Sequence, residues 1–203
     1  MRAMDGLDWA AGAMHAARSR LDIAAQNLAN GSTNAFRKNR AVGTLSERGI
    51  EMTAVRDDAQ GPLRRTGRAL DLAIAGGGSF RVRDRNGVVS ETRNGAFERD
   101  RFGRLCDGEG RIVLGEHGPL TVPADAEFSS SGVVSSRGKA IDRIRLQAGS
   151  TLRSGFLEAS NVDAIGEMVD VLSAQRSFET AQKVFTAIDS ARERATTQVG
   201  VLK

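Results

Sequence analysis

The chain of 203 residues has little cysteine, few aromatic residues and no long apolar run. Its one cysteine, Cys106, has no second thiol for an internal disulfide and no partners at the spacing of a zinc site. No stretch approaches the roughly 18 uninterrupted apolar residues of a membrane span. The first residues, Met1–Arg20, lack the apolar core of a secretory signal. We therefore expect neither a disulfide framework nor a spanning segment. Export by a route without a cleaved signal stays open.

Residues that would carry catalysis are also scarce. The two histidines, His15 and His117, lie far apart in the sequence, and no motif places a second carboxylate, a histidine or a nucleophile with Asp71. Gly76–Gly78 is not followed by the Lys-Ser/Thr pair of a phosphate-binding loop, so it indicates a bulge or a close backbone approach. The sequence therefore predicts a protein that is not an enzyme and that holds no cofactor or metal.

Charged residues are numerous but nearly balanced, with 29 basic and 25 acidic side chains and a net charge of +4. The pI of about 9.9 keeps a basic nucleic-acid-binding module as an alternative. Arginine is spread along the whole chain, whereas nucleic-acid binders usually gather basic residues into a patch or stripe. The scatter favours a protein that binds no nucleic acid. DNA binding that weakens steeply with salt would favour the alternative.

Both ends of the chain have helical periodicity. From Met1 to Asn30, Leu7, Met14, Leu21 and Leu28 repeat every seven residues and predict a helix of ~42 Å. From about Gly155 to Lys203 a similar repeat predicts a helix of ~60 Å, begun by a capping box at Ser160 and Asp163. Its seam residues are Val171, Ala174, Phe178, Ala181, Phe185, Ile188, Ala195, Val199 and Leu202.

The heptad spacing predicts that the two helices pack on each other as a coiled coil and leave their outer faces free for other subunits. Arg18 and Arg192 interrupt the two seams. Their side chains either cover apolar neighbours at the surface or pair with a carboxylate on a neighbouring helix, and the sequence leaves both interpretations open.

The middle of the chain, from about Gly61 to Gln147, contains all three prolines and most of the glycines. Short apolar or alternating runs at Leu70–Ala75, Ser79–Arg83 and Val88–Arg93 predict strands, and Asn86-Gly87 predicts a hairpin turn. The fold class we expect is α+β, with a small, mostly antiparallel β domain between the helices. The expected domains are residues 1–40 with 155–203 for the helices, a linker at 41–60, and the β domain at 61–150.

Specific residues of the first helix add a family resemblance. The stretch Leu21–Asn30, followed by Thr33, Phe36 and Lys38, resembles the opening signature of the flagellar rod, hook and hook-associated family, in which a long helix ends in an ANxxTxxF turn. Asn34-Ala35 stands where this family usually has Thr-Gly. Asn34 tolerates a positive φ, so we expect it to replace the glycine in this turn.

Two further blocks are similar to the same family and follow in the same order. The closing block comprises Leu157–Asp163, Glu167–Val169 and Gln175–Glu179, with Phe178 where tyrosine is common. The middle block comprises Thr66–Ile74, Thr92–Phe97 and Gly103–Leu105. It departs from the family at Ser79, where a phenylalanine is usual, and at Glu91, where an aromatic residue is usual.

The resemblance implies a structural subunit of the bacterial flagellar basal-body rod, which polymerises through its terminal helices into a helical tube that transmits torque. It also implies export by the flagellar type III apparatus without a cleaved signal, and a place in the periplasmic basal body. The implied partners are other rod and hook-basal body proteins and copies of the chain. The runs Leu114–Leu120 and Ser131–Ser135 are similar to the proximal rod member, with the distal rod member or another hook-basal body protein as the alternative.

The residues predicted to form the interface between subunits come from both signatures and both helical seams. They are Leu7, Met14, Leu21, Leu28, Asn30, Thr33, Phe36, Asn161, Val162, Met168, Val171, Arg176, Phe178, Phe185 and Ile188.

Overall fold

The computed structural model describes residues 5–46 and 49–200, and these divide into two compact units. The first, which we call the helical unit, comprises Met1–Gly31, Arg37–Asp58 and Val162–Lys203. The second, the β unit, comprises Ser32–Phe36 and Ala59–Asn161. The chain thus leaves the helical unit twice and returns to it twice.

The first helix, α1 (Gly6–Ala29), begins where Asp5 caps it. The Asp5 carboxylate accepts hydrogen bonds from the backbone N–H groups of Leu7 and Asp8, and the Asp8 side chain accepts one from the N–H of Asp5. This reciprocal capping satisfies donors that would otherwise lack partners in the first turn. The helix ends at Asn30, whose Nδ2 donates to the carbonyl of Gln26 over 2.9 Å.

The second helix, α2 (Ala164–Gly200), begins later than the sequence indicated. The predicted capping box at Ser160 is wrong, because Asp163 caps the helix instead. Asp163 Oδ1 accepts from the N–H of Ile165 over 3.2 Å, and the Asp163 carbonyl accepts from the N–H of Glu167 over 2.9 Å. An aspartate therefore caps the start of each helix, Asp5 in α1 and Asp163 in α2.

Two strands, β1 (Asn39–Ser46) and β2 (Gly49–Arg56), complete the helical unit. They pair antiparallel from Asn39↔Arg56 to Ser46↔Gly49, and both strands contact α1. This hairpin occupies most of the stretch 41–60 that the sequence suggested as a linker. Val42, Thr44 and Thr53 give the stretch the β-branched residues typical of strands.

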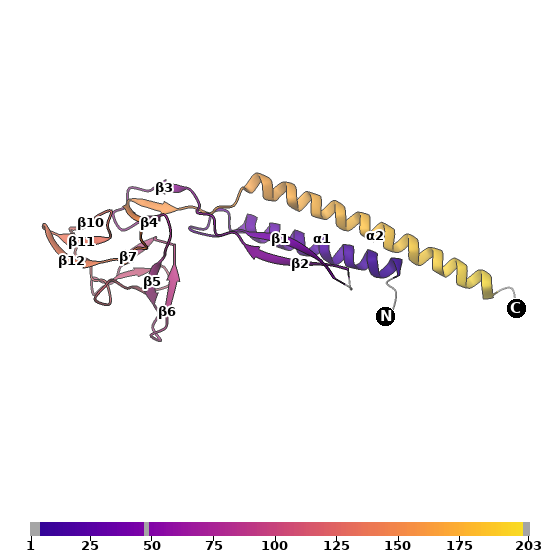
Figure 1. Cartoon of the computed structure of the whole chain (residues 1–203), viewed down its shortest axis with the longest axis horizontal. Helices are drawn as coiled ribbons and strands as arrows, with labels where there is room; N and C mark the ends of the chain where they lie inside the picture. Colours follow the sequence, from indigo (N-terminus) through magenta and orange to yellow (C-terminus); the bar gives the residue numbers. More distant parts are fainter. Residues whose placement is uncertain (1–4, 47–48, 201–203) are drawn as a thin grey trace. The chain divides into compact units, whose positions relative to one another are not determined.

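The prediction that the terminal helices form a coiled coil is wrong. In the helical unit α1 and α2 lie side by side (Figure 1), but no heptad seam of large side chains joins them within the described residues. The buried apolar positions are small, and the predicted seam residues Leu7, Met14, Leu21 and Leu28 are only partly buried. Since α1 also packs on the hairpin, it buries residues on more than one face, whereas a coiled coil buries a single stripe. The buried alanines are Ala10, Ala16, Ala17 and Ala24 of α1 and Ala174 and Ala181 of α2.

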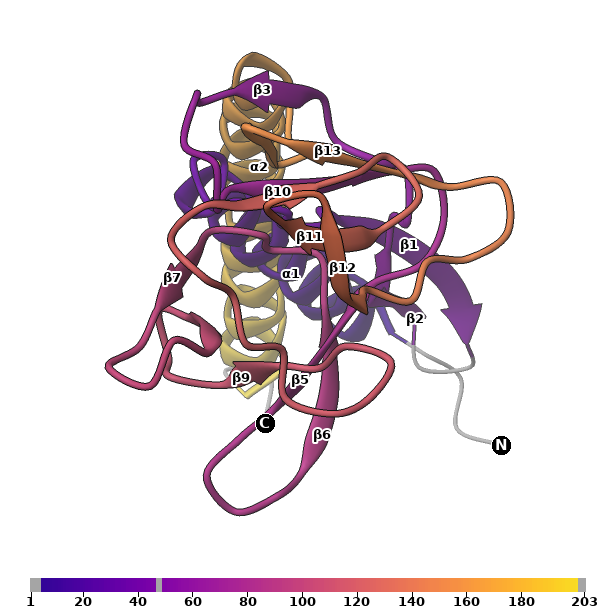
Figure 2. The same cartoon turned by 90° about the vertical axis from the view of Figure 1, so that its left-hand side faces the viewer.

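The β unit consists of short strands in several antiparallel sheets, as the turn-rich sequence predicted. The largest sheet has the order β6-β5-β9-β8-β7. A second has the order β10-β11-β12, and Figure 2 shows its three strands next to one another. β13 pairs with β4, and β14 pairs with β3. The strands are β3 (Leu63–Arg65), β4 (Leu72–Ala75), β5 (Phe80–Arg83), β6 (Val89–Thr92), β7 (Phe97–Arg99), β8 (Leu105–Asp107), β9 (Ile112–Val113), β10 (Ala126–Phe128), β11 (Val133–Ser136), β12 (Lys139–Arg143), β13 (Thr151–Ser154) and β14 (Phe156–Glu158).

The predicted turn between β5 and β6 is confirmed. The N–H of Asp84 donates to the carbonyl of Val88 over 3.0 Å, and Asp84 Oδ1 accepts from the N–H groups of Asn86 and Val88. Gly87 has a φ of 87°, a value that glycine adopts without steric cost. The Asn-Gly pair therefore specifies this hairpin locally.

Apolar side chains from most of these strands form one core in the β unit. At its centre the rings of Phe80 and Phe97 meet edge to face, with centroids 5.0 Å apart. Gly95 lies against β4, and a Cβ atom there would be 1.6 Å from the carbonyl oxygen of Leu72. The core comprises Leu72, Ile74, Phe80, Val82, Phe97, Leu105, Val113, Leu120, Val122, Val134, Ile144 and Leu152.

Candidate subunit interface

The opening and closing signatures meet in the β unit. The N–H of Asn161 donates to the carbonyl of Phe36 over 3.2 Å, and the N–H of Phe36 donates to the carbonyl of Thr33 over 3.3 Å. Asn161 Nδ2 donates to the carbonyl of Ala59 over 2.9 Å. Three predicted interface residues from opposite ends of the sequence thus share one backbone network. Here they support the chain's own fold, so a role between subunits stays a prediction.

The sequence suggested that Asn34 adopts the positive φ of the opening signature. In the structure this conformation lies at Ala35. Ala35 has a φ of 56°, and its N–H donates to the carbonyl of Glu158 over 2.8 Å. This hydrogen bond holds the left-handed conformation at the position where the family usually has glycine. An L-residue there carries steric strain that glycine avoids.

Three polar residues tie the elements of the helical unit together. Asn27 Nδ2 donates to the carbonyl of Asn39 over 2.7 Å and to Glu167 Oε2 over 3.0 Å. Asn27 Oδ1 accepts from the N–H of Asn39 over 2.8 Å. The Asn27 side chain therefore bonds β1 and α2 at once from α1. It is 1% exposed, and buried amides require such partners.

At the other end of α1, Asp5 and Arg192 form an ion pair with a distance of 2.7 Å between Oδ2 and Nη2. The hydrogen bond from Arg192 lowers the pKa of Asp5 below its ordinary value, and the capping N–H of Leu7 lowers it further. Of the two interpretations of Arg192, the structure thus supports pairing with a carboxylate on a neighbouring helix. The pair aligns the start of α1 with residue 192 of α2.

The β unit contains a buried ion pair. Arg93 Nε donates to Glu158 Oε2 over 2.8 Å, and these side chains are 15% and 1% exposed. The guanidinium also donates to the carbonyl oxygens of Ile74, Gly76 and Gly78. The Glu158 carboxylate accepts from the N–H of Gly61 over 3.3 Å. The ion pair joins the segment after β6 to β14, and the hydrogen bond from Gly61 joins the segment that enters the unit to the same strand.

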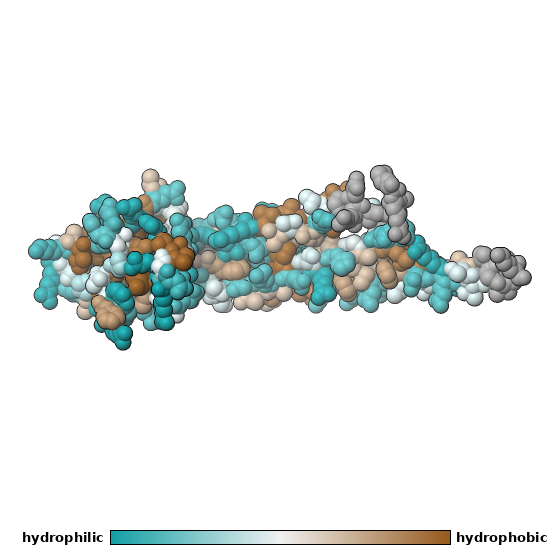
Figure 3. Space-filling model, turned by 90° about the horizontal axis from the view of Figure 1, so that it is seen from below, coloured by the Kyte–Doolittle hydropathy of each residue, from teal (hydrophilic) through white to brown (hydrophobic). Residues whose placement is uncertain are grey.

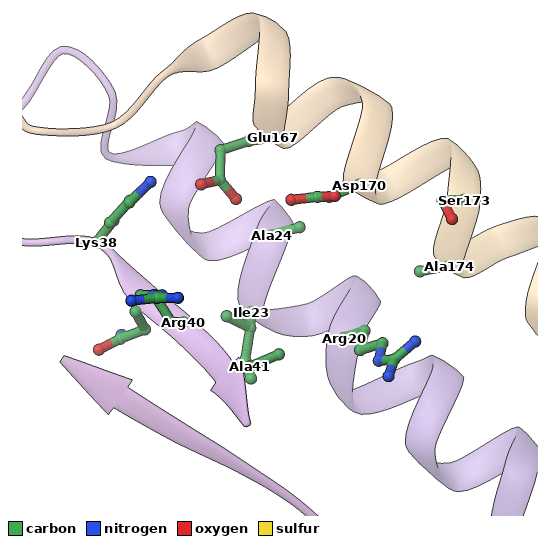
Figure 4. Close-up of a pocket in the computed structure, with 11 residues that line it drawn as sticks. Arg20, Ile23, Ala24, Lys38, Arg40, Ala41, Glu167, Asp170, Ser173 and Ala174 are labelled. Atoms are coloured by element: carbon green, nitrogen blue, oxygen red, sulfur yellow. The ribbon is translucent and has the colours of Figure 1, made fainter. Parts of the chain in front are cut away.

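A polar hollow of about 340 Å³ lies among α1, β1 and α2 in the helical unit. Figure 4 shows Glu167 and Asp170 extending from α2 toward it, with Lys38 and Arg40 on the opposite side, at β1. Arg20 of α1 also lines it. Carboxylates of one element face cations of another, an arrangement that favours attraction between them.

A larger and more apolar groove of about 760 Å³ lies between α1 and α2. Its large side chains include Trp9, Val169 and Leu172, which are 48%, 59% and 55% exposed. In Figure 3 hydrophobic patches interrupt the hydrophilic surface of the helical unit. Exposed apolar groups that lie together mark an interaction surface more often than scattered ones do. The groove is lined by Gly6, Trp9, Ala10, Ala13, Val169, Leu172, Ser173, Arg176, Ser177, Thr180, Ala181 and Val184.

The predicted interface residues have three kinds of surroundings. Met168 is 52% exposed on α2, and Arg176 lines the apolar groove. Thr33, Phe36 and Asn161 belong to the network in the β unit. The rest are partly buried in the helical unit: Leu7, Met14, Leu21, Leu28, Asn30, Val162, Val171, Phe178, Phe185 and Ile188.

Sequence reasoning missed several residues that organise these surfaces. Asn27, Glu167, Arg93 and Glu158 lie inside the blocks quoted for the resemblance, yet only their three-dimensional partners reveal what they do. Trp9 was missed too, although the chain's only tryptophan on an amphipathic helix was a signal that could have been used.

Comparison with known proteins agrees with this architecture. The family described as flagellar hook protein FlgE/F/G D1 domain matches residues 73–140, and the family described as flagellar basal body rod FlgEFG protein C-terminal matches residues 153–198. Within residues 5–46 and 49–200, neither helix combines the length and the apolar character that crossing a bilayer requires. The chain belongs to the flagellar basal-body rod family.

Its relatives include two named rod proteins. It is 29% identical to the flagellar basal-body rod protein FlgF of Escherichia coli, over 85% of this chain and 89% of the relative. It is 28% identical to the flagellar basal-body rod protein FlgG of Agrobacterium fabrum, over 92% of this chain and 96% of the relative. The flagellar hook protein FlgE of Salmonella typhimurium is 32% identical, but only over 54% of this chain and 29% of the relative. FlgF and FlgG are thus matched equally well.

Proposed function

We propose that this chain is a structural subunit of the flagellar basal-body rod, without catalytic activity, and that its helical unit supplies the main surface between subunits. The observation that carries the proposal is the row of half-exposed apolar side chains along α2, in a chain of the rod family. Ile165, Met168, Val169 and Leu172 are 52–76% exposed and recur at helical spacing. Because α2 already packs on α1, a further apolar face of this kind needs a partner beyond the chain.

Contacts between such faces explain assembly. Fully burying a large aliphatic side chain contributes about 1.5–3 kcal/mol, so each half-exposed residue has roughly 1 kcal/mol left to gain. Several of them per subunit would make association favourable without a large interface core. Head-to-tail contacts whose rotation does not close produce an open helical array, the geometry of a tube that transmits torque.

The same proposal covers location and partners. The subunit is exported by the flagellar type III apparatus without a cleaved signal, and it assembles in the periplasmic basal body with other rod and hook-basal body proteins and with its own copies. We propose the proximal position, that of FlgF, with the distal position of FlgG as the alternative. Support comes from the runs Leu114–Leu120 and Ser131–Ser135, which resemble the proximal member.

Incorporation of the chain into basal bodies tests this function. Hook-basal bodies are purified from cells that produce the wild-type chain, Met168→Glu or Gln182→Glu, and the chain is quantified by mass spectrometry. Gln182 is exposed on α2 outside the groove and serves as the matched control. We expect the wild type and Gln182→Glu to be incorporated equally and Met168→Glu several-fold less. Absence of the wild-type chain from purified basal bodies would refute the proposal.

A further inference from the structure

Side chains of opposite charge line the polar hollow of the helical unit from different elements. Glu167 and Asp170 extend from α2, whereas Arg40 belongs to β1 and Arg20 to α1 (Figure 4). None of these four side chains forms an ion pair with a residue of 5–46 or 49–200. Lys38 adds a third cation to the lining. Carboxylates and guanidinium groups therefore face one space and stay separated across it.

The Glu167 carboxylate has one oxygen that is not used within the chain. Glu167 is 7% exposed, and its Oε2 accepts from Asn27 Nδ2 over 3.0 Å. No donor among the described residues forms a hydrogen bond with Oε1. Buried polar atoms in proteins nearly always have a hydrogen-bond partner. Because the carboxylate extends toward the hollow, Oε1 is placed to accept from a donor that enters it.

The signs of the charges select the kind of molecule that fits. A simple cation beside Glu167 and Asp170 would also face the guanidinium groups, and a simple anion would also face two carboxylates. A molecule with one charge of each sign forms charge-assisted hydrogen bonds at both ends. The hollow measures about 340 Å³, near the lower end of the roughly 300–1,000 Å³ of small-molecule sites, so this molecule is small.

Aliphatic side chains complete the lining. Ala24 and Ala174 are each 4% exposed, and Ile23 and Ala41 line the hollow beside them. Small-molecule sites commonly combine apolar walls with a few placed polar groups. The apolar part of the lining suits an aliphatic side chain on the bound molecule.

We propose that the hollow binds a free α-amino acid with an aliphatic side chain. Its ammonium group lies at Glu167 and Asp170, and its carboxylate lies at Arg20 and Arg40. Such a ligand contacts α1, β1 and α2 at once, so its binding stabilises the helical unit. The inference goes beyond the proposed function and does not depend on it.

Titration of the full chain with leucine tests the site. Binding is followed through the amide chemical shifts of the isotope-labelled protein. We expect leucine to shift the amides of Asn39 and Ser173, which line the hollow, with a Kd of about 0.1–1 mM, and to leave the β unit unchanged.

Two analogues of leucine each remove one charge. N-acetyl-leucine lacks the ammonium group and leucinamide lacks the carboxylate, so we expect each to bind at least roughly tenfold more weakly than leucine. Asp170→Asn should weaken leucine and leucinamide severalfold and leave N-acetyl-leucine unchanged. Arg40→Gln should weaken leucine and N-acetyl-leucine and leave leucinamide unchanged. Both substituted side chains are exposed, which favours an intact fold, and Glu179→Gln, exposed on α2 outside the hollow, is the matched control.

Each contrary result removes a distinct part of the inference. Absence of shifts with both leucine and alanine would overturn it entirely. Equal affinity for leucine and its two analogues would overturn the arrangement of two opposite charges. Unchanged leucine binding in both Asp170→Asn and Arg40→Gln would overturn the hollow as the site. A leucine dipeptide that binds more tightly than leucine would overturn the free amino acid as the occupant. Incorporation into basal bodies, measured separately, decides the proposed function.

Discussion

Replacing Glu158 with alanine removes the anionic half of the buried pair in the β unit. The carboxylate accepts from Arg93 over 2.8 Å and from Gln60 Nε2 over 3.3 Å, and it is 1% exposed. Its loss would leave the Arg93 guanidinium without a counter-charge. The backbone N–H of Gly61 would also lose its acceptor.

The expected cost follows from what the guanidinium keeps. Removing one partner of a buried pair typically destabilises a protein by about 3–5 kcal/mol. Arg93 retains three backbone carbonyl acceptors and is 15% exposed, so we expect Glu158→Ala to cost ~3 kcal/mol. Glu158→Gln keeps an acceptor oxygen and loses only the charge. We therefore expect it to lower the free energy of unfolding by ~1–2 kcal/mol. Replacing Arg93 and Glu158 together by methionine should cost less than Glu158→Ala alone, because no buried charge is left unpaired.

Hydrogen exchange is the suitable assay, because it reports each unit separately. The chain's only tryptophan, Trp9, lies in α1, so tryptophan fluorescence reports the helical unit. We expect Glu158→Ala to reduce the protection of the amides of β4 and β14 by ~3 kcal/mol and to leave the protection of α1 unchanged. Glu98→Gln, at a side chain 70% exposed, is the matched control and should change protection by less than about 0.5 kcal/mol. A cost below ~1 kcal/mol for Glu158→Ala, or a double variant as costly as the two single changes added, would refute the reasoning.

Three further predictions address single positions. Ala35→Gly should stabilise the β unit by up to ~1 kcal/mol in urea unfolding, since relief of the left-handed strain of ~1–2 kcal/mol exceeds the added entropy of the unfolded chain, and a loss of stability would contradict this. Gly95→Ala should cost more than ~3 kcal/mol because its Cβ would overlap a backbone oxygen, whereas Gly108→Ala, with open space around it, should stay within about 0.5 kcal/mol. Asp5→Asn keeps a good helix cap but removes the charge that pairs with Arg192. Since the folded pKa of Asp5 is depressed, its charge stabilises the helical unit above the ordinary value of 3.8, and this contribution is lost as the pH falls through the folded pKa. The difference between wild type and Asp5→Asn in thermal unfolding followed by circular dichroism should therefore be full at pH 7 and shrink as the pH falls below 3.8.

Local signals predicted local structure well. The Asn86-Gly87 turn and the strand beginning near Phe80 follow from residues close in the sequence, and the structure contains both. The helix end at Asn30 is likewise specified by a side chain that bonds one turn back. Such features depend on neighbours a few residues apart, which a single sequence displays directly.

Features that depend on distant partners were not predicted. Arg93 and Glu158 are 65 positions apart, and no local pattern signals their pairing. The coiled-coil prediction failed because Ala10, Ala17 and Ala24 repeat every seven residues just as the leucines do, so periodicity could not show which stripe is buried. The hairpin at β1 and β2 escaped detection because most of its residues on both faces are exposed, which removes the alternation that marks a half-buried strand.

The predicted domains, residues 1–40 with 155–203 and residues 61–150, are parts expected to fold independently. Their boundaries therefore stay a prediction. The structure shows two compact units, with Arg37–Asp58 in the helical unit. Whether the helical unit folds without neighbouring subunits depends on how much it gains from burying its exposed stripe. Low protection of α2 in the isolated chain and higher protection in basal bodies would show that assembly stabilises it.

Deleting the chain and examining basal bodies by electron microscopy tests the central claim most directly. If the chain is a rod subunit, cells without it should be non-motile, their basal bodies should end in an incomplete rod without a hook, and the wild-type chain supplied in trans should restore both. Complete rods carrying hooks in cells that lack the chain would contradict the account.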